Sequence, residues 1–243
     1  MRPSEQEQEQ DKPSFLDHLE VLRWVLIRSL IAIIILLPLT YWGAQPAINR
    51  LIHDCAPPGF SLQYFTLMEP FLTQLKVALI LTLYLACPYI AWQFWRFTIP
   101  ALRDHERRNV GWLTFSSWFL FVGGTAFGYF TVLPLLVSFS LSFENASLHQ
   151  LLGLSDFVSI AVILLLAFGL IFQLPIVVIT LVRLGLVSKA ILKRQRPIIV
   201  VGIALVAGII TPGPDVVSQL AMAIPTYILF ECSLLICRDP KPK

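Results

Sequence analysis

The sequence predicts an all-α integral membrane protein with six transmembrane helices and with both termini in the cytoplasm. Three observations lead to this prediction. Hydrophobic residues make up 56% of the 243 residues and charged residues only 14%, with a mean hydropathy of +0.74, so the chain is too apolar for a soluble domain. The apolar residues form long runs, and Lys and Arg gather in alternate connections between these runs.

Four of the apolar runs are each near the ~20 residues that a helix needs to cross a ~30 Å hydrocarbon core. A polar tail rich in Glu and Gln, residues 1–13, precedes them, and we expect it to be disordered. The membrane domain then covers residues 14–238, and a short basic tail follows at 239–243. The predicted spans are residues 24–44, 76–95, 110–133 and 157–182.

The last apolar stretch, residues 197–237, is interrupted at 211–215 by TPGPD, a sequence that a continuous helix does not hold. The distribution of Lys and Arg decides between one span and two, because positive charge concentrates on the cytoplasmic side. It places both termini in the cytoplasm, so the number of spans is even and this stretch is a hairpin of two short helices. Its first arm, 197–210, would be only roughly 21 Å long, which requires local bilayer thinning, snorkelling or association with another helix.

Two long connections face the outside in this topology. Residues 45–75 contain several prolines, and we expect a capped loop with short interfacial helices. Residues 138–156 form a second external loop that contains no Lys or Arg. Short, charged connections on the other side suggest a rigid scaffold whose cytoplasmic surface recognises a binding partner.

The sequence lacks the motifs of several common enzyme classes, including the phosphate loop, H-E-x-x-H and G-x-S-x-G. Its four histidines lie at or outside the ends of the predicted spans, and its four cysteines have no metal-ligand spacing. We therefore predict no metal, no cofactor and no enzymatic activity. The net charge of +3 follows from the membrane topology and does not indicate nucleic-acid binding.

Polar residues at membrane depth usually face protein or water, because burying them in lipid is costly. Gln173 could satisfy a carbonyl group that Pro175 leaves without a donor, and Lys76 could snorkel to the outer surface. Asp215 could cap the last helix, and Glu231 could reach the interface. The residues alone leave these structural roles and functional ones open.

Several longer stretches occur in a specific order along the chain. They are DHLEVLR (17–23), PFLTQLK (70–76), PYIAWQFWRFTIPALRDHERR (88–108), FGLIFQLP (168–175), KRQRP (193–197) and TPGPDVVSQLAMAIPTYILFE (211–231). In these stretches the chain resembles the TatC family, the six-span core subunits of the twin-arginine protein translocase. The resemblance extends over nearly the whole chain.

The resemblance implies a receptor for folded proteins that carry an Arg-Arg signal peptide. The signal would dock on the cytoplasmic face, at the N-terminal segment and the first internal loop. A carboxylate pairs with a guanidinium through charge-assisted, often bidentate hydrogen bonds, so Glu106 suits one signal arginine; a local ion pair with Arg103 or Arg107 is the alternative. The implied signal-binding residues are Glu106, Glu20, Phe97 and Arg23.

The same resemblance implies single-span partner subunits of the TatA and TatB type, a homo-oligomer within a hetero-complex, the inner membrane as location and the proton-motive force as energy source. A small-solute secondary transporter is the alternative function, but it would favour an inverted repeat and a midplane ion site, neither of which the sequence shows. A membrane insertase is a third reading. The residues expected to contact partner helices or to act as intramembrane polar groups are Gln173, Thr211, Asp215, Gln219, Pro88 and Lys76.

Two departures from the family pattern concern carboxylates. Family members usually read His-Leu-x-Glu-Leu-Arg near the N-terminus, whereas here Val21 stands at the acidic position and Glu20 comes one place earlier. On a helix this shift turns the carboxylate by about 100°. Gln173 stands where the family commonly has Glu, so a hydrogen-bonding group is kept while a titratable group is lost.

Overall fold

The computed structural model of the chain describes residues 15–55, 62–98, 110–142, 153–183, 185–210 and 216–237. Within these ranges the chain is helical apart from turns, short connections and an isolated backbone pairing between Gln63 and Gly153. The tails predicted at 1–13 and 239–243 lie outside the described residues. The all-α prediction is confirmed.

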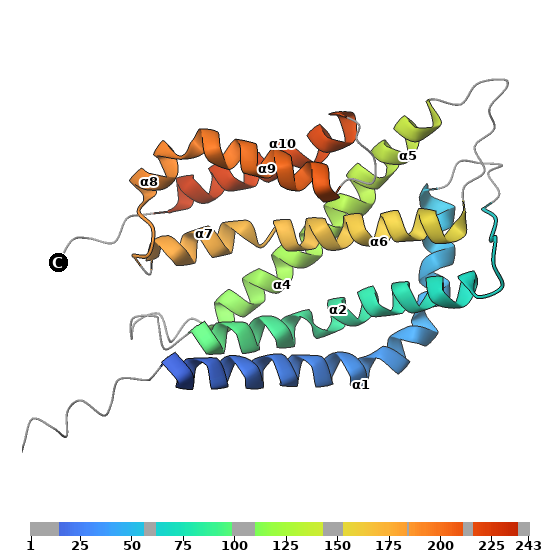
Figure 1. Cartoon of the computed structure of the whole chain (residues 1–243), viewed down its shortest axis with the longest axis horizontal. Coiled ribbons are helices and arrows are strands. Elements are labelled where there is room, and N and C mark those ends of the chain that lie inside the picture. The colour runs from blue at the N-terminus through green and yellow to red at the C-terminus, as the bar shows by residue number, and fades with distance from the viewer. Residues whose placement is uncertain are drawn as a thin grey trace, which may run out of the picture.

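The helices run back and forth along the length of the molecule (Figure 1). Five described stretches are long and apolar enough to cross a membrane, and α9 is a shorter apolar helix. The start of α1 and the end of α10 lie at the same end of the molecule (Figure 1), and which side of the membrane this end faces stays a prediction. The elements are α1 (Phe15–Cys55), α2 (Glu69–Thr98), α4 (Val110–Phe127), η3 (Gly128–Val132), α5 (Leu133–Leu141), α6 (Leu154–Ile171), α7 (Leu174–Arg183), α8 (Lys189–Arg194), α9 (Arg196–Ile210) and α10 (Val216–Ile236).

Helix α1 is longer than predicted. It continues past residue 44 to Cys55, through the first part of the expected external loop, and it bends so that its last part runs steeply across the rest (Figure 1). Pro38 and Pro46 lie inside the helix. A proline removes one backbone donor and commonly bends a helix without ending it, so reading the prolines as the start of a loop was wrong for residues 45–55.

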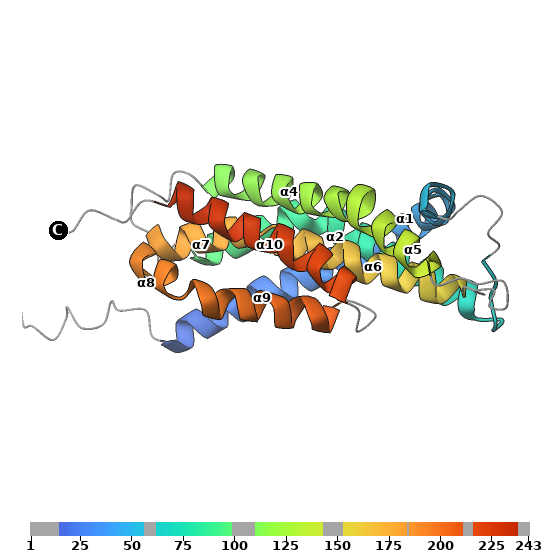
Figure 2. The ribbon, with the colours of Figure 1, turned by 90° about the horizontal axis from the view of Figure 1, so that it is seen from above.

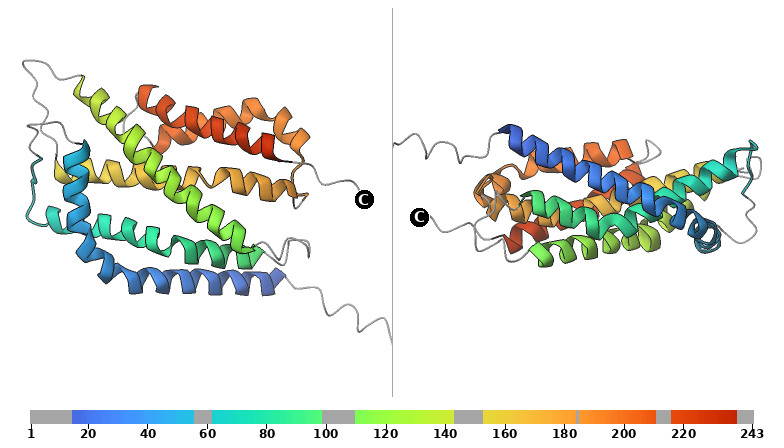
Figure 3. Two further views of the ribbon diagram at one scale, coloured as in Figure 1. Left: turned by 180° about the vertical axis from the view of Figure 1, so that it is seen from behind. Right: turned by 90° about the horizontal axis from the view of Figure 1, so that it is seen from below.

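The third and fourth crossings are also interrupted differently from the prediction. The third continues beyond residue 133 through the π-helical turn η3 and ends at Leu141, with Pro134 in the first turn of α5, where the missing N–H matters least. The fourth is divided into α6 and α7 at Phe172 and Gln173. Helices α4 and α5 cross the other helices diagonally (Figure 3).

The last two helices form the predicted hairpin, but they differ in length. Helix α9 has 15 residues, as expected for a short arm. Helix α10 has 21 residues, enough for a crossing, so the prediction that both helices are short is wrong for α10. Pro225 lies inside α10 without ending it.

Helices α4 and α6 approach each other closely at Gly124. A Cβ atom at Gly124 would lie 2.5 Å from the carbonyl oxygen of Phe168 and 2.6 Å from Cγ of Phe172, so this approach requires glycine. The G-x-x-x-G sequence at 124–128 therefore serves packing within the chain. Helix α4 lies on one face of the molecule and α9 on the other, with α6 and α7 between them (Figure 2).

Candidate functional site

The predicted signal-binding residues that the structure describes lie at one end of two adjacent helices. Helices α1 and α2 pack against each other more extensively than any other pair, and the start of α1 lies beside the end of α2 (Figure 1). Glu20 and Arg23 are exposed near the start of α1, and Phe97 is half-buried near the end of α2. Glu106 lies outside the described residues, eight positions after Thr98 in the sequence.

A buried polar network holds the end of α2 in place two residues before Phe97. The indole Nε1 of Trp95 donates a hydrogen bond to Oγ of Ser117 at 2.9 Å, and both residues are 4% exposed. Gln173 Nε2 donates to the backbone oxygen of Ser117, also at 2.9 Å. The network therefore joins α2, α4 and the break between α6 and α7.

The network changes the interpretation of Gln173. Its amide group bonds to a carbonyl of α4, and not to the carbonyl that Pro175 leaves without a donor in its own crossing. A carbonyl oxygen needs a donor, which an amide supplies and an ionised carboxylate does not. Gln173 therefore donates this hydrogen bond through its neutral amide, whereas a Glu at the same position could donate it only when protonated.

The remaining intramembrane polar residues at α9 and α10 mostly bond within the chain. Gln219 Nε2 donates to the backbone oxygen of Ala204 at 2.9 Å and so joins the two arms of the hairpin. Glu231 accepts hydrogen bonds from Arg196 at 2.7 Å and from the Tyr227 hydroxyl at 2.8 Å, which replaces the idea that it simply reaches the interface. Pro88 is an exposed residue inside α2, and Thr211 and Asp215 lie outside the described residues.

Comparison with known proteins identifies the family. A sequence profile of the family described as "Sec-independent protein translocase protein (TatC)" matches residues 17–225. The chain belongs to the TatC family. The family resemblance noted in the sequence is thereby confirmed.

Individual TatC proteins match nearly the whole chain. The Sec-independent protein translocase protein TatC of Carboxydothermus hydrogenoformans is 37% identical over 235 residues, which cover 96% of this chain and 97% of that protein. The TatC protein of Escherichia coli K12 is 34% identical over 237 residues, covering 94% and 90%. A crystal structure of a "Twin Arginine Translocase Receptor- TatC" in DDM superposes with a TM-score of 0.83 at 33% identity, covering 91% of this chain and 99% of that one.

These matches establish the protein as a membrane-embedded subunit of a Sec-independent protein translocase. They give no support to the alternative of a small-solute secondary transporter.

At the other end of this TatC chain, a buried carboxylate that the sequence analysis did not single out joins two helix starts. Glu69, which is 8% exposed, accepts backbone hydrogen bonds from Phe65 at 2.7 Å, from Thr66 at 3.3 Å and from Ser155 at 2.9 Å. An acidic residue in the first turn of a helix is a known capping signal, and Glu69 begins α2. The sequence does not, however, indicate that the segment around Ser155 is the partner of Glu69.

Lys76 lies two helical turns after Glu69 and contacts the same part of α6. Its Nζ donates to Oγ of Ser155 at 3.1 Å and to Oγ of Ser159 at 2.8 Å. Lys76 therefore binds α6 although its side chain is exposed. The contact gives Lys76 partners on α6, and the suggestion that it snorkels to the outer surface stays a prediction.

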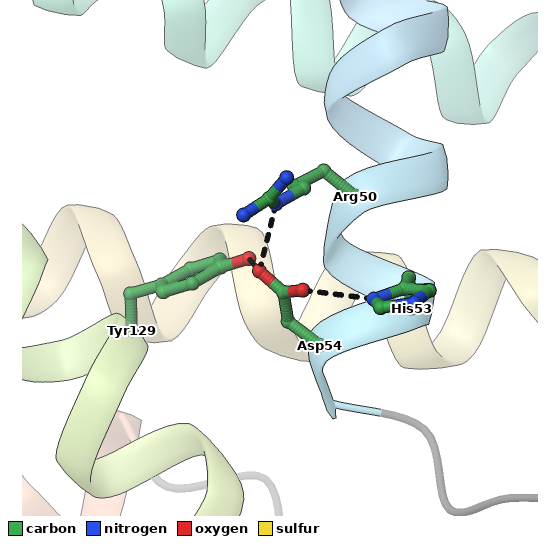
Figure 4. A network of polar contacts seen from close by, with 4 residues as sticks. All are labelled: Arg50, His53, Asp54 and Tyr129. Carbon is green, nitrogen blue, oxygen red and sulfur yellow. Dashed lines mark hydrogen bonds and ion pairs between the residues drawn. The ribbon is translucent and has the colours of Figure 1, made fainter.

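A second carboxylate at this end fastens the last part of α1 to the π-helical turn η3 (Figure 4). Asp54 Oδ2 accepts hydrogen bonds from Arg50 Nε at 3.1 Å and from the Tyr129 hydroxyl at 2.8 Å. Its Oδ1 lies 3.1 Å from Nδ1 of His53. No pattern in the sequence indicates this contact, because it depends on the bend of α1 and on the π-helical turn that carries Tyr129.

Proposed function

We propose that the chain is the signal-recognition subunit of its translocase, binding signal peptides with paired arginines at the end where α1 starts and α2 ends. The observation that carries the proposal is the side-by-side position of these two helix ends, with Glu20 exposed on one and Phe97 half-buried on the other. The structural relative described as a twin-arginine translocase receptor supports the same function.

The proposed chemistry is recognition of guanidinium groups by carboxylates. Glu20 lies near the start of α1, and Glu106 follows the end of α2 by eight positions in the sequence, so we expect each of the two chain segments to contribute one carboxylate. Arginine presents a planar fork of donors, and a carboxylate accepts two of them at once. An aromatic ring such as Phe97 can pack against the apolar part of the signal or stack on a guanidinium.

Binding of a synthetic signal peptide to the detergent-solubilised protein tests this function directly. The Arg-Arg peptide should bind and a matched Lys-Lys peptide should bind much more weakly, because the ammonium group cannot form the bidentate contact. Equal affinities for the two peptides would contradict the proposal.

We further infer that the protein lies in the inner membrane with both termini in the cytoplasm. Single cysteines placed at His105 and His149, in the connections after α2 and after α5, should then react with a membrane-impermeant thiol reagent from opposite sides of sealed vesicles. Position 149 should react from the external side. Labelling of both positions from one side would exclude this topology.

The short helix α9 supports recruitment of single-span partner subunits. Its 15 residues span roughly 22 Å, less than the hydrocarbon core, and Ile209 near its end is 82% exposed. A partner helix packed there would relieve the mismatch in length, and polar groups such as the Gln219 carbonyl could accept a hydrogen bond from it.

Photo-crosslinkers at Ile209 and Gln219 should therefore capture a single-span partner in membranes. Phe119 of α4 is 64% exposed and provides a matched control on a different helix. Equal capture at Phe119, or capture of lipid alone at Ile209 and Gln219, would refute this contact.

A further inference from the structure

An apolar groove of about 570 Å³ runs between α9 and the α6–α7 crossing, with α10 as its floor. Helix α9 packs chiefly on α10 and makes few contacts with α6, and its ribbon runs apart from the ribbons of α6 and α7 (Figure 2). The groove passes the break in the fourth crossing and continues along α9. Its lining includes Leu170, Leu174, Ile199, Gly202, Ile203 and Phe230.

The length of the groove matches the depth of one membrane leaflet. Its lining on α9 extends from Ile199 to Ile210, twelve residues whose eleven steps rise roughly 16 Å. This is close to half of a ~30 Å hydrocarbon core. An extended acyl chain of one leaflet therefore fits along the groove.

The lining of the groove suits an acyl chain. It is apolar apart from Thr226, whose hydroxyl already donates a hydrogen bond to the backbone oxygen of Met222, so an occupant without polar groups leaves nothing unsatisfied there. The exposed Ile209, where partner capture is expected, is absent from the groove lining. The groove and that contact are therefore separate surfaces of α9.

Positive charge lies at one end of the groove. Leu192 of α8 belongs to the lining, and the next two residues, Lys193 and Arg194, are exposed. The carboxylate of α10 at this end, Glu231, is already paired with Arg196. Basic side chains beside an apolar groove at the membrane surface are the chemistry that selects an anionic lipid.

We propose that this groove binds one anionic phospholipid, with an acyl chain along α9 and the phosphate against Lys193 and Arg194. The lipid would fill the space between the short helix and the broken crossing, and it would support α9 where the helix is too short for the bilayer. This site is independent of the proposed binding of signal peptides.

Gly202 allows a variant that fills the groove without straining the fold. A Cβ atom added at Gly202 meets no heavy atom within 4 Å, so Gly202→Leu places its side chain in the space proposed for the acyl chain. Gly43 of α1 is a matched control, because its added Cβ also meets nothing within 4 Å and it is absent from the groove lining. Both changes replace a helical glycine by a better helix former.

Native mass spectrometry of the detergent-purified protein with added phosphatidylglycerol, phosphatidylcholine or glycerol phosphate tests the proposal. The wild type should retain one phosphatidylglycerol more tightly than phosphatidylcholine, and glycerol phosphate alone should not bind. Gly202→Leu should weaken both lipids about tenfold or more, whereas Gly43→Leu should not. Lys193→Gln combined with Arg194→Gln should weaken phosphatidylglycerol alone, by about ten- to thirtyfold.

Three outcomes would overturn the proposal. The first is unchanged lipid retention in folded Gly202→Leu, and the second is unchanged preference for phosphatidylglycerol in the Lys193→Gln, Arg194→Gln protein. The third is a photo-crosslinker at Ile203 that captures a protein in membranes instead of lipid. If Gly202→Leu did not fold, the charge variant would still decide, because it changes only exposed side chains.

Discussion

Glu106→Gln should weaken binding of an Arg-Arg signal peptide by about ten- to a hundredfold, or roughly 1.5 to 3 kcal/mol, which is the contribution of a charge-assisted hydrogen bond. The substitution keeps the size of the side chain and removes only its charge. Titration of the purified protein with a labelled signal peptide at low salt measures the effect.

Three comparisons make this result specific. The loss should be small for a Lys-Lys peptide, and higher salt should weaken the wild type and narrow its difference from the variant. Glu20→Gln should cost less than Glu106→Gln, because the carboxylate near the start of α1 is shifted by one position from the usual family pattern. Equal affinities of folded wild type and Glu106→Gln would reduce Glu106 to a local partner of Arg103 or Arg107.

Glu69→Ala should produce the largest loss of stability among single substitutions at the end of the molecule opposite the signal site. The substitution leaves three backbone N–H groups, those of Phe65, Thr66 and Ser155, without their acceptor. These hydrogen bonds to a charged acceptor are partly buried, so their loss destabilises the fold, and for a chain of this size the expected decrease in melting temperature is roughly 5–10 °C. Tryptophan fluorescence during heating in detergent would measure it.

Two further variants separate the role of the carboxylate from a general effect. Glu69→Gln keeps one acceptor oxygen and should lose about half as much stability. Lys76→Met removes the contacts with Ser155 and Ser159 but leaves the backbone donors satisfied, so it should have a smaller effect than Glu69→Ala. An unchanged melting temperature for Glu69→Ala would mean that water replaces the carboxylate and that the contact contributes little.

The crossings could be predicted from the sequence because they depend on local composition. The TPGPD sequence at 211–215 and the alternation of basic connections were enough to predict the hairpin of α9 and α10. The continuation of α1 to Cys55 could not be predicted in this way, since Pro46 is compatible with both a loop and a bent helix. Packing against the neighbouring helices decides between them.

The candidate site was predictable only where a residue type indicates its partner. The charge of Glu106 and Glu20 suits guanidinium recognition, and family resemblance gave their place in the chain. The hydrogen bonds from Trp95 and Gln173 to Ser117 were not predictable, because they join three crossings that are distant in the sequence. The same holds for the clusters around Glu69 and Asp54.

The clusters around Glu69 and Asp54 hold helices α2 and α1 at the ends opposite the proposed signal site. Glu69 fastens the start of α2 and Asp54 fastens the end of α1, while the opposite ends of both helices carry the proposed signal site. Helix α2 has 30 residues and is therefore roughly 45 Å long, so a tilt of about 5° around its fastened start would move Phe97 by roughly 4 Å. Such a displacement would break the hydrogen bond from Trp95 to Ser117, which holds this end of α2 against α4, so a signal peptide that moves Phe97 must release that contact while the start of the helix stays fastened.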